Sequence, residues 1–354
     1  MSETTTTLMS GNDAIGEGAL RAGLRFYAGY PITPQNELTA YMAEHLPARG
    51  GVFIQSESEV AAINMVYGAS AAGARTMTSS SSPGISLKQE GISYAAAAHL
   101  PLVVVNVMRA GPGLGNIWPA QSDYFQATKG GGHGDYRVIV LAPASVQESF
   151  DLTREAFDLA DRYRMPVMVL SDGMLGQMME GVALPPQGQP PAPVPKPWAL
   201  TGAKGRRPNI VRSLFLARDG VEKNNLFLQQ RYKRIVSRET RLEAYRMEGA
   251  RAAIVAYGSM ARIARAVVDG ARRRGVKVGL LRPITLWPFP AKELARFSRK
   301  TRRFLVAEMS YGQMVEDVRL SVDKATDVRF YGRAGGGIPT PKQLERELGR
   351  LLAR

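Results

Sequence analysis

The residues best suited to chemistry lie close together between Gly29 and Gly84. The first group is Tyr30-Pro31-Ile32-Thr33-Pro34, in which prolines lie on both sides of Thr33. Proline fixes its own backbone and favours extended geometry in the residue before it. The Thr33 hydroxyl is therefore expected to point in a defined direction. The same residues could instead form a rigid turn with Thr33 as the cap of a following helix, and both interpretations stay open.

Two carboxylates, Glu57 and Glu59, precede an apolar stretch that begins at Val60. The helix dipole favours acidic side chains in the first turn of a helix, so capping alone would explain them. If one of them faces inward, it could hydrogen-bond a nitrogen atom of a ligand. Glu59 leads directly into the apolar residues, and we expect it to be the less exposed of the two.

Strands and helices are predicted to alternate around these residues. In the expected helix at 59–72, Val60, Ile63, Val66 and Tyr67 share one face. Such alternation predicts a doubly wound parallel sheet, in which ligands bind at the carboxyl ends of the strands. The expected strands are 26–29, 52–55, 75–79, 102–108, 137–141 and 167–170, and the expected helices are 11–23, 38–46 (stopped by Pro47), 59–72, 85–98 and 146–163.

A proline-rich stretch separates this block from the rest of the chain. Seven prolines between Pro185 and Pro197 exclude a helix or a central strand and indicate a stiff linker. A helix is expected at 222–247, and a second, smaller α/β block follows with strands at 253–257, 277–282 and 304–308 and helices at 261–274 and 313–321. We therefore predict domains at 1–184 and 251–354, joined by a proline-rich and basic linker at 185–250.

Composition excludes several classes of site. The 354 residues include no cysteine, so disulfides, thiolate nucleophiles and cysteine-ligated iron–sulfur clusters are excluded within this chain. The three histidines are scattered at 45, 99 and 133, and no metal site is expected. No apolar run approaches the length of a membrane span, and the polar start at 1–7 is not a signal peptide, so we expect a cytoplasmic protein.

The formal net charge of +15 is unevenly distributed. Residues 201–354 carry 34 Lys and Arg against 14 Asp and Glu, whereas residues 1–200 carry 12 against 17. Solvated basic faces would explain the surplus, and so would an acidic partner, a phosphate-bearing ligand or nucleic acid. Nucleic acid is not expected, because zinc-finger spacing and RNA-binding aromatic motifs are missing from the sequence.

Taken together, these residues closely resemble the α subunit of the 2-oxoacid:ferredoxin oxidoreductases. The resemblance covers most of residues 11–182 and rests on Gly-Tyr-Pro-Ile-Thr-Pro at 29–34, Glu-Ser-Glu-Val-Ala-Ala at 57–62, the Ser-Pro-Gly turn at 82–84 and the stretch 172–177. Tyr-Gly-Ser at 257–259, Trp-Pro-Phe-Pro at 287–290 and Glu308 before Gly312-Gln313 are similar to the transketolase-C-terminal-like domain of the same subunit. The implied fold is α/β, with a thiamine-diphosphate-binding-type domain on the pyrimidine side of the cofactor and a smaller second domain.

The resemblance implies oxidative decarboxylation of a 2-oxoacid on thiamine diphosphate, with electrons passed to ferredoxin and an acyl-CoA released. It places the aminopyrimidine of the cofactor on this chain, and the diphosphate and Mg²⁺ on a β subunit. The 4Fe-4S clusters would lie on partner subunits, and γ and ferredoxin-like δ subunits are expected beside β.

Site roles follow from the same resemblance, position by position. Glu59 matches the glutamate at pyrimidine N1′, which promotes the imino tautomer whose nitrogen acts as the local base. Thr33 matches a threonine at the substrate carboxylate, and Tyr30, Pro31 and Ile32 lie beside the cofactor. Arg109, after the strand at 102–108, matches an arginine that reaches the substrate or CoA; a surface salt bridge is its alternative role.

Three further stretches bear on the site. Gln121 and His133 lie in a glycine-rich region and are candidates for cofactor contact, although His133 could equally be a loop residue. Asp172, in Ser-Asp-Gly, has only the proline linker downstream of it, where a diphosphate motif requires an asparagine in a suitable loop. We therefore do not expect this chain to bind the diphosphate. Residues 106–126 look most like the branched-chain (2-oxoisovalerate) members, with 2-oxoglutarate as the alternative substrate.

Two other classes of function stay open at this point. A non-enzymatic basic protein would bind nucleic acid tightly and in a salt-sensitive manner. A self-sufficient transketolase-like enzyme would be active as the purified chain with thiamine diphosphate and Mg²⁺ alone, although the chain lacks a diphosphate motif.

Overall fold

Strand β5 (Leu102–Met108) contributes alternate side chains to two hydrophobic cores, one on each side of the same sheet. Val103, Val105 and Val107 pack in a core with helices α1 (Gly11–Arg21), α2 (Asn36–Ala48) and α6 (Val146–Tyr163). Val104 and Met108 pack with α3 (Glu59–Ala71) and α4 (Ser82–Ala97). Because successive strand residues point to opposite faces, the result is a sheet covered by helices on both sides. The computed structural model describes residues 5–186 and 194–353.

The first sheet has seven strands in the order β12-β6-β7-β5-β4-β2-β3. All neighbouring strands are parallel except β12, which pairs antiparallel with β6. The fully buried and mostly apolar strands β5 and β7 lie at its centre, as expected for strands covered on both faces. The bounds of the remaining strands are β2 (Phe26–Gly29), β3 (Val52–Gln55), β4 (Thr76–Ser80), β6 (Ile139–Leu141), β7 (Pro166–Asp172) and β12 (Thr285–Trp287).

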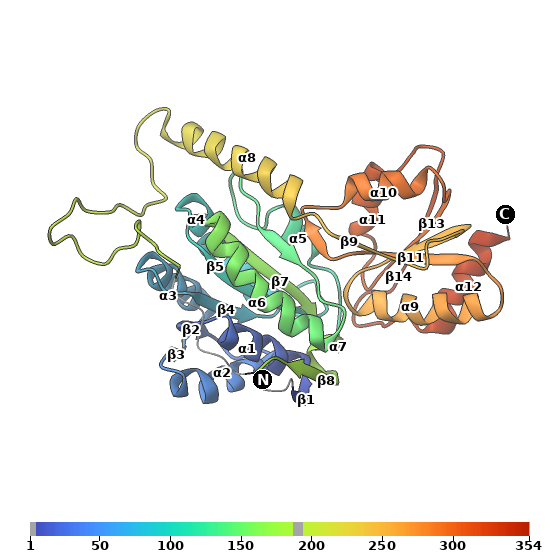
Figure 1. Cartoon of the computed structure of the whole chain (residues 1–354), viewed down its shortest axis with the longest axis horizontal. Coiled ribbons are helices and arrows are strands. Elements are labelled where there is room, and N and C mark those ends of the chain that lie inside the picture. The colour runs from blue at the N-terminus through green and yellow to red at the C-terminus, as the bar shows by residue number, and fades with distance from the viewer. Residues whose placement is uncertain (1–4, 187–193, 354) are drawn as a thin grey trace.

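A second unit is built around five strands in the order β14-β13-β10-β11-β9, of which β9 is antiparallel. Helices α9 (Gly258–Arg273) and α12 (Pro341–Leu352) pack on one face, and α10 (Ala291–Ser298) and α11 (Met314–Ser321) share the core on the other. Figure 1 shows this unit as a separate lobe that ends in the C-terminus. The strands are β9 (Leu242–Tyr245), β10 (Ala252–Val255), β11 (Val278–Pro283), β13 (Arg303–Glu308) and β14 (Asp327–Gly332).

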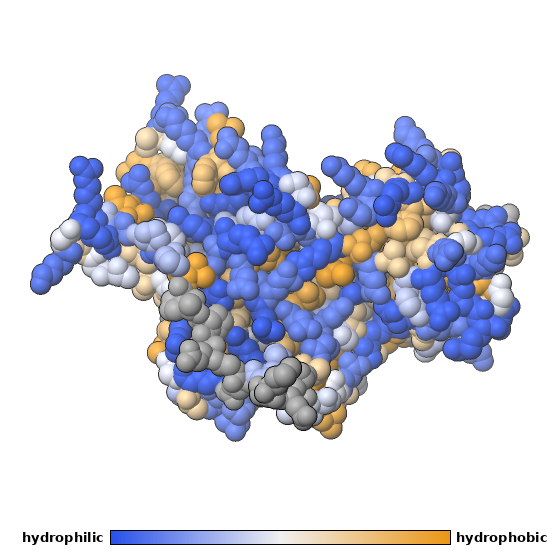
Figure 2. Space-filling model, in the orientation of Figure 1, coloured by the Kyte–Doolittle hydropathy of each residue, from blue (hydrophilic) through white to orange (hydrophobic). Residues whose placement is uncertain are grey.

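The remaining elements connect or flank these units. Strands β1 (Thr5–Ser10) and β8 (Met179–Leu184) form a small antiparallel sheet, with the short helix α7 (Gly173–Gln177) before β8. Helix α5 (Tyr124–Lys129) follows a long loop after β5, and α8 (Gly220–Arg238) crosses the outside of the first lobe (Figure 1). Figure 2 shows a largely hydrophilic face with hydrophobic patches between the two lobes. Among the described residues, no helix is long and apolar enough to cross a bilayer.

The predicted fold class is confirmed: a doubly wound, almost wholly parallel sheet with a smaller α/β unit beside it. Several element bounds were wrong. The helix expected at 222–247 ends at Arg238, where the buried Glu239 bonds Tyr163 and Arg162, and β9 then joins the second sheet. The helix expected to stop at Pro47 continues to Ala48, with the proline in its last turn. The domain bounds 1–184, 185–250 and 251–354 stay a prediction.

The buried face of α3 also differs from the prediction. Val60 is exposed, and the inward face consists of Glu59, Ala62, Ile63, Val66 and Ser70. These positions follow helical spacing. Because Glu59 takes the first inward position, the next residue, Val60, points to solvent. In the same way, Ser82-Pro83-Gly84 is the first turn of α4 and not a free-standing turn, since proline is well accepted there.

Candidate active site

The carboxyl ends of β2, β4 and β5 bring three separate segments to one edge of the first sheet. The Tyr30–Pro34 turn follows β2, the start of α4 follows β4, and Arg109 follows β5. Glu59 lies on the helix after β3, the neighbour of β2. This edge of an open α/β sheet is where ligands bind, because loops and helix N-termini meet there.

Glu59 is the first residue of α3 and is 6% exposed, whereas Glu57 is exposed. Ser58 caps the helix by accepting a hydrogen bond from Ala61 N (3.2 Å), which leaves the Glu59 side chain free of that task. Glu59 Oε1 lies 3.5 Å from Ser80 Oγ at the end of β4. The choice of Glu59 as the inward carboxylate therefore agrees with its burial.

Gly84 makes room for the Glu59 carboxylate. A Cβ on residue 84 would lie 2.4 Å from Glu59 Oε1 and 2.1 Å from Ser80 Oγ, closer than such contacts occur. Gly84 is buried in the first turn of α4, so the N-termini of α3 and α4 meet at this carboxylate. The partial positive charge at each helix start favours an anionic side chain.

Arg109 and Thr33 are brought together. Arg109 is buried, and its Nη1 donates to Thr33 O (2.9 Å) while its Nη2 donates to Leu114 O (3.1 Å). The Thr33 hydroxyl is half-buried and accepts a hydrogen bond from Asn36 Nδ2 (3.3 Å). Arg109 therefore holds the Thr33 turn and is not a surface salt bridge. Tyr30 and Pro31 are exposed and Ile32 is half-buried, so this turn forms the rim of the edge.

Buried polar atoms at this edge that have no hydrogen-bond partner within the described chain include Ser81 Oγ, Asn106 Oδ1 and Arg109 Nε. Between them, Ser82 Oγ accepts from Arg109 N (3.0 Å) and donates to Asp123 Oδ2 (2.5 Å). Burial raises the pKa of Asp123, and the hydrogen bonds from Ser82 and Asn106 oppose that shift. Unsatisfied donors and acceptors beside a glycine cradle fit a site that is completed by a bound group.

Gln121 and His133 have their contacts elsewhere. Gln121 is fully buried; its Nε2 donates to Tyr257 O (2.9 Å) and its Oε1 accepts from Met309 N (3.1 Å), which ties the two units together. His133 is exposed, its ring lies against Tyr94 of α4 at 6.1 Å between centroids, and its carbonyl accepts from Ser93. In the described residues neither side chain contacts Glu59, Thr33 or Arg109. Their cofactor roles stay predictions.

One residue that the sequence reasoning did not single out lies directly behind Glu59. Lys88 is fully buried on α4; its Nζ donates to Thr78 Oγ1 (3.0 Å) and Glu59 O (3.4 Å). Burial lowers the pKa of Lys88 to about 7, and the negative charge of Glu59 opposes that shift. Lys88 lies three residues after Ile85 and four before Ile92, both of which are buried. A charged residue at a core position of an apolar helix face was the available signal.

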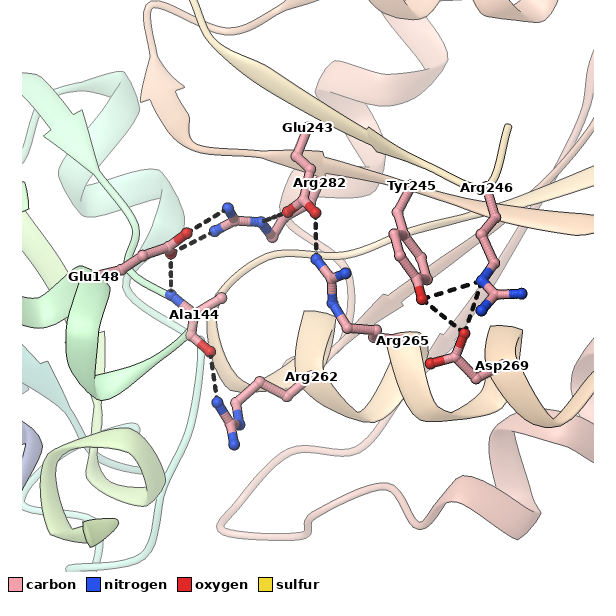
Figure 3. Close-up of polar contacts among 9 residues, drawn as sticks. All are labelled: Ala144, Glu148, Glu243, Tyr245, Arg246, Arg262, Arg265, Asp269 and Arg282. Atoms are coloured by element: carbon pink, nitrogen blue, oxygen red, sulfur yellow. Dashed lines mark hydrogen bonds and ion pairs between the residues drawn. The ribbon is translucent and has the colours of Figure 1, made fainter. Parts of the chain in front are cut away.

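A separate cavity of about 500 Å³ lies between the two units, away from Glu59. It is rich in arginine, but each guanidinium shown is paired with a carboxylate of the chain: Arg282 with Glu148 and Glu243, and Arg265 with Glu243 (Figure 3). Arg262 pairs with Glu180 (2.6 Å) and also donates to Ala144 O (3.2 Å). We assign this network to holding the units together, because its positive charges are already matched.

Asp172 contributes to the same junction. Its Oδ1 accepts from Met174 N (3.0 Å), Leu175 N (3.1 Å) and Ser259 Oγ (2.6 Å), and its Oδ2 accepts from Ser259 N (3.3 Å). Burial raises the pKa of this carboxyl, and these hydrogen bonds oppose that shift. The carboxylate caps α7 and anchors the start of α9, which leaves it no free direction toward a metal ion.

Comparisons with known proteins agree on one group of enzymes. Residues 17–246 match the family model of the thiamine-diphosphate-binding domain of pyruvate flavodoxin/ferredoxin oxidoreductases, and residues 250–344 match core domain II of pyruvate:ferredoxin oxidoreductase. The chain is 52% identical to ketoisovalerate oxidoreductase subunit VorB of Methanothermobacter thermautotrophicus, over 94% of both chains. It is 42% identical to 2-oxoglutarate synthase subunit KorA of Archaeoglobus fulgidus, over 92% of this chain and 94% of the other.

Solved structures show the same architecture. A 2-oxoglutarate:ferredoxin oxidoreductase from Magnetococcus marinus, with 2-oxoglutarate, coenzyme A and succinyl-CoA bound, matches with a TM-score of 0.85 and 30% identity. The match covers 99% of this chain and 66% of that one. A split-gene transketolase matches with a TM-score of 0.60 at 13% identity, which shows the fold alone.

Proposed function

This chain belongs to the 2-oxoacid:ferredoxin oxidoreductase family as an α subunit, and on that premise we propose that it takes part in the oxidative decarboxylation of a branched-chain 2-oxoacid. The products are the corresponding acyl-CoA, CO₂ and reduced ferredoxin. The branched-chain substrate is supported by the higher identity to the ketoisovalerate subunit, 52% against 42% for the 2-oxoglutarate synthase subunit. The buried Glu59 carboxylate, in the cradle left by Gly84, is the observation that carries the proposal.

We propose that this edge of the sheet holds the aminopyrimidine of thiamine diphosphate, with Glu59 at the ring nitrogen N1′. When bound, the cofactor supplies a nucleophilic carbon that attacks the 2-oxo group of the substrate. The chain's own residues orient it: Glu59 offers a buried carboxylate as hydrogen-bond partner, and Gly84 lets that carboxylate approach. Arg109 keeps the Thr33 turn in place, and its unpartnered Nε fits a substrate carboxylate or a CoA phosphate.

Partner subunits complete the enzyme in this proposal. A β subunit holds the diphosphate and Mg²⁺, and γ and ferredoxin-like δ subunits carry the 4Fe-4S clusters that pass electrons to ferredoxin. The chain has no cysteine to ligate a cluster, and the Asp172 carboxylate is already committed to Ser259 and α7. Exposed apolar residues in the Thr33 turn and in the loop after Arg109 fit an interface with β: Tyr30, Leu114, Ile117 and Trp118.

The proposal is tested with the complex of this chain and its partner subunits, by viologen reduction in the presence of CoA. We expect 2-oxoisovalerate to give a kcat/KM at least about tenfold above that for 2-oxoglutarate, since branched and acidic side chains demand opposite pockets. The isolated chain with thiamine diphosphate and Mg²⁺ should be inactive. Activity of the isolated chain would instead favour a self-sufficient transketolase-like enzyme. Tight, salt-sensitive binding of nucleic acid without oxidoreductase activity in the complex would favour a basic binding protein.

A further inference from the structure

Lys88 is a cation enclosed in the core of the first unit, directly behind the Glu59 carboxylate. Its side chain is fully buried on α4, between the buried residues Ile85 and Ile92 of the same helix face. An ammonium carries three donors, and Nζ uses two of them, toward Thr78 Oγ1 at 3.0 Å and Glu59 O at 3.4 Å. Burying a charged group with incomplete hydrogen bonding opposes folding, so packing alone does not account for a lysine here.

The surroundings of Lys88 leave Glu59 as its charged neighbour. Helix α3 contributes Glu59, and β4 contributes the hydroxyl of Thr78. Strand β5 contains no ionisable side chain, and the one in β7, Asp172, is bonded to Ser259 and the start of α7. Burial lowers the pKa of Lys88 to about 7, and Glu59 favours its charged form. Lys88 therefore contacts Glu59 through the backbone carbonyl at the start of α3.

We propose that Lys88 is a positioning residue for Glu59, holding the first turn of α3 so that the Glu59 carboxylate stays in its buried cradle. The bond from Nζ to Glu59 O fixes the backbone from which the carboxylate projects. The inference rests on the proposed function, since it assigns to Lys88 an effect on the group that binds the cofactor pyrimidine.

A positioning role and a purely structural role predict opposite effects on stability. If Lys88 only supports the fold, replacing it lowers the melting temperature of the chain. If it serves Glu59 at the expense of stability, Lys88→Met raises the melting temperature, because methionine fills a similar volume without a buried and incompletely hydrogen-bonded ammonium group. The same substitution then weakens cofactor binding.

The test uses Lys88→Met in the complex with its partner subunits, prepared free of thiamine diphosphate. The matched control is Lys292→Met, which makes the same change at an exposed position of α10. We expect thiamine diphosphate to bind about tenfold more weakly to the Lys88→Met complex, as for the loss of one hydrogen bond from a charged donor, here the one that fixes the start of α3. The melting temperature should rise by about 2 °C or more, so that cofactor affinity and stability change in opposite directions. Lys292→Met should match the wild type in both.

The possible outcomes distinguish a failure of the proposed function from a failure of the positioning role of Lys88. If the wild-type complex does not bind thiamine diphosphate, the proposed function itself is wrong. If the wild type binds it and Lys88→Met binds it equally well, the positioning role is wrong. A lower melting temperature for Lys88→Met would also overturn the inference, because it would show that Lys88 supports the fold.

Discussion

The Glu59 carboxylate occupies the space in which a side chain on residue 84 would begin, since a Cβ there would lie 2.4 Å from Glu59 Oε1. The two residues are in the first turns of α3 and α4, which follow different strands of the sheet. The packing of one helix against the other therefore sets where the carboxylate can lie. This position of the Glu59 carboxylate therefore requires glycine at residue 84.

Replacing Gly84 with alanine is expected to damage the site more than the fold. The added Cβ would also lie 2.1 Å from Ser80 Oγ, so either Ser80 and Glu59 or the start of α4 must shift. Overpacking of this kind costs about 1–3 kcal/mol of stability. We expect the affinity for thiamine diphosphate to fall at least about tenfold, because a shift of about 1 Å removes the aligned hydrogen bond. Reconstitution of the cofactor-free complex measures both values.

Gly68→Ala is the matched control for this substitution. Gly68 is exposed in α3, and a Cβ there meets no atom of the described chain within 4 Å. Alanine in a helix interior is favoured over glycine by about 0.5–1 kcal/mol, so this variant should be slightly more stable and equally active. Equal affinity for thiamine diphosphate in Gly84→Ala and Gly68→Ala would contradict the claim that the site needs a glycine at residue 84.

The interdomain network shown in Figure 3 predicts a second stability effect. Arg282 is buried and bonds Glu148 through two parallel hydrogen bonds of 2.7 and 2.8 Å, and its Nε donates to Glu243 (2.6 Å). Glu148→Gln leaves this buried guanidinium with one matched carboxylate. We expect a loss of about 2 kcal/mol in the free energy of unfolding, measured by urea denaturation.

Glu345→Gln provides the comparison, because it breaks the exposed pair of Arg274 and Glu345. Such surface pairs contribute about 0–1 kcal/mol. If the two variants lose the same stability, the Arg282–Glu148 pair does not hold the units together.

The sequence predicts the fold correctly where local signals are strong. The prediction fails where a strand forms only by pairing with residues far away in the sequence. The apolar run at 102–108 placed β5 correctly, and the prolines flanking Thr33 placed the turn after β2 correctly. Strand β12 was missed because its three residues pair with β6, more than 140 positions earlier in the chain. Strand β9 was missed for the same reason: its partner β11 follows a complete helix, and the basic residues before it continue a helical pattern.

The site residues, like the fold, could be predicted where the signal is local. Glu59 and Arg109 could be singled out because a carboxylate before an apolar helix and an arginine after a buried strand are local signals. The hydrogen bonds of Gln121 to Tyr257 and Met309 depend on how the two units pack, and nothing near Gln121 in the sequence indicates them. Lys88 has a local signal, because it is a charged residue at a core position of a helix. Its contact with Glu59 depends on the packing of α3 against α4, which the sequence does not indicate.

The buried Lys88 also predicts how stability varies with pH. Its pKa is lowered to about 7 from an ordinary value of 10.5, so between these values the unfolded chain binds a proton that the folded chain does not. Stability therefore rises with pH across this window, and the cost of burying Lys88 is greatest below it. Lys88→Met removes that cost.

The stabilisation by Lys88→Met should exceed about 1 kcal/mol at pH ~6 and shrink toward pH ~10. Urea unfolding of the wild type and the variant at both pH values measures the difference. A stabilisation that is constant over this range, or that grows with pH, would contradict a lowered pKa of Lys88 in the folded chain.

The most direct test of the account compares Glu59→Gln with Glu57→Gln in the complex with partner subunits. The two residues are two positions apart, but only Glu59 is buried at the edge of the sheet, so the same chemical change probes one site and one surface. We expect Glu59→Gln to assemble normally and to reduce kcat for 2-oxoisovalerate-dependent viologen reduction by at least about 100-fold, the range for a lost acid–base group. Glu57→Gln should retain wild-type activity. Wild-type turnover by an assembled Glu59→Gln complex would contradict the central claim.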